Sequence, residues 1–227
     1  MNRARNAWSR PARHGAYVLA LLAASALALP GATQATPTDS AAPAVTAIKA
    51  GRLVDVAAGQ IRRDQVLLIS GDTILSVGPA GSTAIPAGAT VIDLSNATVM
   101  PGLIDAHTHV TANPYEGSYD GLATSVPRAT VRGVANAQKM LMAGFTTIRD
   151  VGSPAFSDVA IRDAIADGEV PGPRMLVSGP ALGITGGHCD NNLLPPEYAD
   201  TSDGVADGPT EVRRVVRRNI KIGRAHV

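Results

Sequence analysis

The order of hydrophobic and polar positions divides this chain into two regions of different character. Residues 45–99 contain short apolar runs separated by glycine- and proline-containing turns, without a repeat of helical period. This pattern is typical of β-strands joined by tight turns. The expected strands are Ala47–Ala50, Arg52–Asp55, Gln65–Ile69, Thr73–Val77 and Thr90–Leu94. We therefore predict a small all-β region over residues 45–99.

From residue 100 onward, short apolar strands alternate with segments of helical period. A helix near Arg128–Met142 is expected to bury Val131, Val134, Leu141 and Met142, with Gly144 as its carboxyl-terminal cap. The other expected elements are the strands Thr146–Asp150 and Arg174–Ser178, the helix Ser157–Asp167 ending at Gly168, and the helix Glu211–Lys221, whose apolar stripe is Val212, Val215, Val216 and Ile220. Repeated strand–helix units require a parallel sheet with right-handed crossovers. A doubly wound open sheet is the alternative, but no glycine-rich phosphate loop follows the first strand.

The apolar run Val99–Val110 contains Asp-Ala-His-Thr-His, the most informative group of residues in the chain. Side chains alternate along a strand, so Asp105, His107 and His109 share one face and the two imidazoles can converge on one ion. Neutral imidazole is a good ligand for zinc and similar metals. A pair of surface histidines is the simpler explanation, but the preceding Pro-Gly and the aspartate in phase favour a metal site at His107 and His109.

The segment Pro101–His109 resembles the first-strand metal motif of the amidohydrolase superfamily, whose members hydrolyse amide and related C–N bonds. Gly144–Gly152, Gly172–Met175 and Gly186–Asp190 are similar to segments of its imidazolonepropionase-like and Xaa-Pro dipeptidase-like branch. The resemblance implies an α/β fold: residues 100–221 as the first three βα units of a (β/α)8 TIM-like barrel, and residues 45–99 as half of a small, incomplete β-sandwich. The length is short of the ~250 residues typical of a whole barrel.

The resemblance also implies one or two divalent metal ions, zinc above all, at the mouth of the barrel. Of the superfamily's ligands only His107 and His109 map onto this sequence. The bridging lysine and the general-base aspartate are expected beyond the chain end, and Lys221 is not assigned the bridging role. Asp105 is expected either beside the metal without binding it or packed in the barrel interior. We therefore expect the 227-residue chain itself to be inactive.

Four further features have less specific interpretations. His188, in a glycine-rich loop, is a candidate substrate-binding residue or a histidine bonded to nearby backbone. The lone Cys189 is expected to be an idle thiol, because no activating base is identifiable. Arg149 and Asp150 are expected to stabilise the barrel through an ion pair, with contact to substrate as the alternative. Tyr115 and Tyr119 are candidates for lining the pocket.

The ends of the chain carry their own signals. Arginines precede the apolar segment Ala16–Leu29 and a stretch of small residues, a pattern that predicts a secretory signal over residues 1–35, cleaved after Ala35 or alternatively after Ala28. Residues 36–44 are expected to form a flexible leader. Export to the periplasm follows, without a permanent anchor, because the apolar segment is shorter than the ~20 residues of a spanning helix. Residues 222–227 resemble translated sequencing-adapter sequence, so we expect a non-native tail there and a gene that continues in frame.

Composition narrows the partners. The formal net charge is +1, and the arginines at 213–218 lie on an amphipathic helix, which argues against nucleic-acid binding. The expected partner is a small-molecule or peptide substrate, and a homo-oligomer that closes the open sheet is an alternative arrangement. The sequence thus predicts an exported, metal-dependent amidohydrolase, with dipeptides favoured as substrates. A cyclic-amide hydrolase of imidazolonepropionase type and a non-catalytic binding protein on the same barrel are the alternatives.

Overall fold

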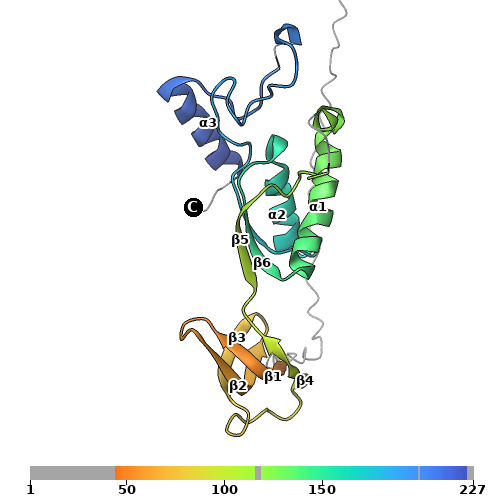
Figure 1. Cartoon of the computed structure of the whole chain (residues 1–227), viewed down its shortest axis with the longest axis vertical. Helices are drawn as coiled ribbons and strands as arrows, with labels where there is room; N and C mark the ends of the chain where they lie inside the picture. Colours follow the sequence, from red (N-terminus) through yellow and green to blue (C-terminus); the bar gives the residue numbers. More distant parts are fainter. Residues whose placement is uncertain (1–43, 116–118, 199, 224–227) are drawn as a thin grey trace, which may run out of the picture. The chain divides into compact units, whose positions relative to one another are not determined.

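The computed structural model describes residues 44–115, 119–198 and 200–223. The predicted signal peptide, most of the predicted leader and residues 224–227 of the predicted tail lie outside these residues. Two separate sheets make up the β-structure, one in residues 45–99 and one in residues 103–177 (Figure 1). Within the described ranges, every helix falls short of the length and hydrophobicity that crossing a bilayer requires.

The first sheet has four strands in the order β3-β2-β1-β4. They are β1 (Val45–Asp55), β2 (Gln60–Ser70), β3 (Thr73–Pro79) and β4 (Thr90–Val99). β2 pairs antiparallel with both β1 and β3, whereas β4 pairs parallel with β1. Apolar side chains of β3 and β4 remain exposed, among them Ile74, Leu75, Val91 and Ile92. One part of this sheet therefore presents apolar side chains to solvent, and the half-sandwich assignment of residues 45–99 stays a prediction.

The prediction of two separate strands at Ala47–Ala50 and Arg52–Asp55 is wrong, because both belong to β1. The pairing with β4 shifts register between Ala50 and Arg52. At Gly51 a Cβ atom would lie 1.8 Å from the carbonyl oxygen of Ser95. The glycine between the two apolar runs permits a close approach of the β4 backbone at an irregularity of one continuous strand.

The second sheet is parallel, as the strand–helix alternation predicts. Its strands are β5 (Leu103–Thr108), β6 (Phe145–Asp150) and β7 (Arg174–Val177), in that order. The helices are α1 (Val126–Met142), α2 (Ser157–Ala166) and α3 (Gly208–Gly223), with short 3-10 turns η1 (Asp120–Ala123), η2 (Pro154–Phe156) and η3 (Pro196–Tyr198). Figure 1 shows α1 and α2 side by side along β5 and β6. Their shared core contains Val110, Ile148, Ile161 and Met175.

The expected buried face of α1 is only partly right. Val131 and Met142 are 62% and 80% exposed, whereas Ala129, Gly133 and Ala137 are buried. A Cβ on Gly133 would lie 2.4 Å from Cδ1 of Ile161 on α2. The two helices therefore meet along a row of small residues spaced four apart, and a search for large apolar residues passes over such a row.

The helices begin and end within a few residues of the positions predicted from the sequence. α1 begins two residues before the expected Arg128, because the Ser125 hydroxyl accepts a hydrogen bond from the backbone N–H of Arg128 and caps the helix. Gly144 and Gly168 take positive φ values after α1 and α2, as expected of helix-ending glycines. α3 runs two residues beyond Lys221, and the carbonyl of Gly223 accepts a hydrogen bond from Arg162.

Candidate metal centre and its pocket

His107 and His109 are brought together at the carboxyl end of β5, as the alternation predicts. Thr108 between them points to the other side, where its hydroxyl donates to the carbonyl of Arg149 at 3.1 Å. The two imidazole centroids lie 5.5 Å apart with an interplanar angle of 73°. Both histidines are exposed, and both line the same pocket.

The orientation of His109 is set by a backbone carbonyl. Its Nδ1 lies 3.0 Å from the carbonyl oxygen of Gly152, in the loop after β6. A carbonyl can only accept, so the proton sits on Nδ1, which in the neutral ring leaves the lone pair of Nε2 free. Metal-binding histidines commonly show this arrangement, with the second ring nitrogen donating to a carbonyl or carboxylate. The donor chemistry at His109 therefore fits a divalent metal.

The described residues supply only part of a metal site. Within residues 44–115, 119–198 and 200–223, no group of three or more histidine, cysteine, aspartate or glutamate side chains is placed to hold an ion. Asp105 is half-buried, lines a cavity with His107, and accepts the backbone N–H of His107 at 3.0 Å. Of its two expected locations, the structure gives the one beside the histidines.

The expected ion pair between Arg149 and Asp150 is wrong in its chemistry. Successive residues of a strand point to opposite sides, so Arg149 is exposed and donates to the carbonyl of Ala106 at 2.7 Å. Asp150 is fully buried and accepts hydrogen bonds from the backbone N–H groups of Val110 and Gly152. Burial raises the pKa of Asp150 above its ordinary value, and these hydrogen bonds offset part of that rise. Both residues hold the barrel together, but through backbone partners.

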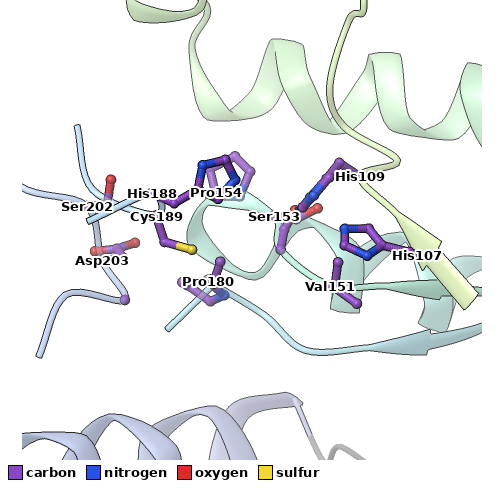
Figure 2. A pocket seen from close by; sticks show the side chains of 13 residues that line it. His107, His109, Val151, Ser153, Pro154, Pro180, His188, Cys189, Ser202 and Asp203 are labelled. Atoms are coloured by element: carbon purple, nitrogen blue, oxygen red, sulfur yellow. Dashed lines mark hydrogen bonds between the residues drawn. The ribbon is translucent and has the colours of Figure 1, made fainter. Parts of the chain in front are cut away.

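A pocket of about 490 Å³ lies in front of the two histidines. Figure 2 shows His107 and His109 on one side of it and His188 and Cys189 on the other. His188, proposed from its glycine-rich context, thus faces the metal-binding candidates across the pocket. Cys189, expected to be idle, also lines it and is half-buried. Tyr115 and Tyr119 do not line this pocket; they are 94% and 67% exposed.

Sequence reasoning missed Ser153, Ser202 and Asp203, which also line the pocket. Ser202 and Asp203 arrive there through the long loop between β7 and α3. The loop is closed at its base, where Gly183 N–H donates to Gly204 O at 3.2 Å and Ala206 N–H donates to Gly183 O at 2.8 Å. Because this closure joins Gly183 to residues 21 and 23 positions further along the chain, local sequence carries no signal for it.

Asp190 organises the inside of the same loop. Its carboxylate accepts the backbone N–H groups of Gly186, Asn191 and Ser202 at 2.8, 2.8 and 3.1 Å. The bonds from Gly186 and Ser202 hold the pKa of Asp190 below its usual range. One carboxylate therefore ties together the two stretches that carry His188 and Asp203.

The structure combines a parallel sheet flanked by helices with a pocket lined by two neighbouring histidines. A sequence model of the amidohydrolase family matches residues 98–226, more than half of the chain, so the chain belongs to this family. The predicted resemblance and the predicted fold, an amino-terminal part of an amidohydrolase barrel, are both confirmed. The chain's relatives include an ochratoxinase and a Xaa-Pro dipeptidase, so the predicted class, a hydrolase of carbon–nitrogen bonds, is carried forward as a proposal for the whole protein.

Similarity to individual proteins supports the same family assignment. Ochratoxinase of Aspergillus niger is 34% identical over 199 residues, which cover 79% of this chain and 40% of ochratoxinase. A Xaa-Pro dipeptidase with methionine bound in its active site superposes with a TM-score of 0.68 at 29% identity, over 78% of this chain and 45% of the dipeptidase. A prolidase in complex with N-methylphosphonate-L-proline superposes with a TM-score of 0.65 at 31% identity, over 78% of this chain and 44% of the prolidase. The chain thus spans less than half of each relative.

Proposed function

We propose that the whole protein is an exported, metal-dependent hydrolase of amide bonds and that His107 and His109 are two of its metal ligands. The hydrogen bond from His109 Nδ1 to the Gly152 carbonyl is the observation that carries the proposal. It leaves Nε2 as the only metal-binding atom of that ring, whose centroid lies 5.5 Å from that of His107. An incidental pair of surface histidines would need no such orientation.

Zn²⁺ is the ion we favour, because neutral imidazole is among its commonest ligands. When bound, the ion would supply a Lewis acid for the substrate carbonyl and water of lowered pKa. Catalytic zinc sites use three protein ligands and keep one position open, and among the described residues no third ligand joins His107 and His109. The 227-residue chain by itself is therefore proposed to be inactive.

Residues of this chain would then orient the substrate rather than transfer its protons. His188 faces the metal-binding candidates across the pocket and is positioned to donate a hydrogen bond to a substrate carbonyl or carboxylate. Asp105 would act through the backbone of His107, whose N–H it accepts. The loop closed at Gly183 and Gly204 would limit the length of substrate that fits.

Dipeptides are the substrate class that we propose. The pocket volume of about 490 Å³ lies within the ~300–1,000 Å³ usual for small-molecule sites. The relatives include a Xaa-Pro dipeptidase, a prolidase and ochratoxinase, which supports a substrate with an amide bond.

The ligand assignment can be tested on the protein expressed from the full gene. His107→Ala and His109→Ala should each lower zinc content and abolish hydrolysis, whereas His188→Ala should retain zinc and raise KM. His188→Ala is a matched control because it removes an imidazole from the same pocket. If His107→Ala and His109→Ala both keep the zinc content of the wild type, the assignment is refuted.

The activity itself is tested on a panel of dipeptides, including Xaa-Pro peptides, together with acyl amides and a cyclic amide. Turnover of a dipeptide supports the proposal, and turnover of the cyclic amide alone would redirect it to an imidazolonepropionase-like reaction. Tight binding without turnover of any amide would favour a non-catalytic binding protein on the same barrel.

Export is tested by cell fractionation and amino-terminal sequencing of the processed protein. We expect the periplasmic form to begin at Thr36, and deletion of residues 1–35 should leave the protein inside the cell. A cytoplasmic protein that keeps its first residues would contradict export without affecting the metal site.

A further inference from the structure

We infer that Asp150 is a positioning residue for the metal ligand His109, acting through the carbonyl of Gly152. The inference rests on the proposed metal role of His109 and adds a residue that does not itself touch metal or substrate. Asp150 is fully buried at the end of β6, on the strand next to the one that carries the histidines. No functional role follows from its position alone; its hydrogen-bond partners provide the argument.

The carboxylate of Asp150 holds the segments on both sides of the His109 ring. Its Oδ2 accepts the backbone N–H of Val110, the residue after His109, at 2.5 Å. Its Oδ1 accepts the backbone N–H of Gly152 at 3.1 Å and the hydroxyl of Ser153 at 3.1 Å. Gly152 then presents its carbonyl to His109 Nδ1 at 3.0 Å. Both the backbone beside the imidazole and the acceptor of its proton therefore depend on one side chain.

A carboxylate is needed because every donor in this group must find an acceptor. Backbone N–H groups point at both oxygens, and the site is closed to water. An amide side chain offers one oxygen and one NH₂, so either Val110 or Gly152 would face another donor. The loop carbonyl or the strand end would then have to move, and the Nδ1–H tautomer of His109 would lose its fixed partner.

Asp158 provides a matched control within the same barrel fragment. It is also fully buried, and its two oxygens accept the backbone N–H groups of Val159 and Gly179. Neither of these bonds holds Val110 or Gly152 directly; Gly179 reaches the Gly152 loop only through its carbonyl, which accepts the backbone N–H of Ser153 at 3.1 Å. Asp158→Asn should therefore disturb packing to a similar degree as Asp150→Asn with a much weaker effect on the metal ligand.

The experiment compares Asp150→Asn, Asp158→Asn and wild type in the full protein expressed from its gene. In the metal-free protein, the ¹⁵N NMR chemical shifts of the imidazole nitrogens report the tautomer of His109. We expect the Nδ1–H form in wild type and Asp158→Asn, and a mixture of tautomers in Asp150→Asn. Zinc affinity, measured by competition with a chelator, should fall about 10–100-fold in Asp150→Asn, as is usual when a residue supporting a ligand is lost. Asp158→Asn should stay within about twofold of wild type.

Equal tautomers and equal zinc affinities in the two aspartate variants would overturn the inference. If Asp150→Asn fails to fold, Ser153→Ala removes one donor to the same carboxylate and keeps the backbone bonds. In Ser153→Ala we expect a smaller loss of the Nδ1–H tautomer of His109 and a smaller fall in zinc affinity than in Asp150→Asn. If neither the tautomer nor the zinc affinity changes, the inference is equally overturned. Should His109→Ala leave zinc affinity unchanged, the proposed metal role fails instead, and that result is read from a different variant.

Discussion

At the scale of single residues, the candidate metal centre depends on how closely backbone segments approach one another. Gly152 carries the carbonyl that orients His109, and a Cβ at this position would lie 2.8 Å from Cβ of Ala181 and 3.4 Å from Cε1 of His109. The glycine is thus required by space rather than by an unusual backbone angle. Its neighbours come from β5 and from the loop after β7.

Gly152→Ala should therefore lower the free energy of unfolding by about 1–3 kcal/mol, the usual cost of overpacking. Gly81→Ala is the control, since a Cβ at Gly81 meets no atom within 4 Å. The control should change stability by no more than about 0.5 kcal/mol, as exposed positions do. Thermal or denaturant unfolding measures both, and equal stability of the two variants would contradict the crowding seen at Gly152.

A second prediction at the residue scale concerns pH. Burial raises the pKa of Asp158 above its ordinary value of 3.8, so the folded state binds the proton more tightly than the unfolded state. The contribution of Asp158 to stability is fully present below 3.8 and is lost as the pH rises through its folded-state pKa. Asp158→Asn does not titrate, so its stability relative to wild type should increase over this window, by about 1.4 kcal/mol per unit of pKa elevation. Denaturant unfolding at several pH values checks the trend; a difference that is constant with pH would contradict it.

At the scale of helices and strands, the order and type of the elements could be predicted, whereas their buried faces could not always be. The alternation of strands and helices from β5 to α3 and the glycines that end α1 and α2 are local properties of the sequence. Which face of α1 is buried depends on its neighbouring helix, α2. Because Ile161 of α2 fills the space above Gly133, small residues are buried and Val131 is left in solvent.

Gly133→Leu tests this helix contact. The larger side chain must enter space occupied by Ile161 and Thr111, so we expect a loss of about 1–3 kcal/mol of stability in spite of the better helix propensity of leucine. Val131→Ala should be nearly neutral, within about 0.5 kcal/mol, because Val131 is exposed. If unfolding curves show that Val131→Ala loses more stability than Gly133→Leu, the buried face of α1 is the one predicted from hydrophobicity.

The site shows the same division between local and distant information. His107 and His109 could be predicted because the two-residue period of a strand places both on one face. The roles of Gly152 and Asp150 could not, because their partners lie about forty positions earlier in the chain, across the β5–β6 pairing. Ser202 and Asp203 reach the pocket only after the loop has closed on itself.

At the scale of the whole molecule, the described residues provide two imidazoles and one edge of a barrel. We predict that the 227-residue chain loses zinc on dialysis and shows no measurable amide hydrolysis, while a protein that spans the full length of the relatives retains both. Metal analysis and the dipeptide assay on the two proteins check this. A soluble dimer of the 227-residue chain with stoichiometric zinc and activity would instead mean that a second copy completes the site.

The closed base of the loop between β7 and α3 has a consequence for protein engineering. The hydrogen bonds between Gly183, Gly204 and Ala206 join the two ends of the loop through backbone atoms alone. We therefore expect residues 184–203 to be exchangeable as a unit, as long as the carbonyl at position 203 still accepts the hydrogen bond from Arg218. Such a graft would replace the wall of the pocket that carries His188 and Asp203 and leave His107 and His109 in place.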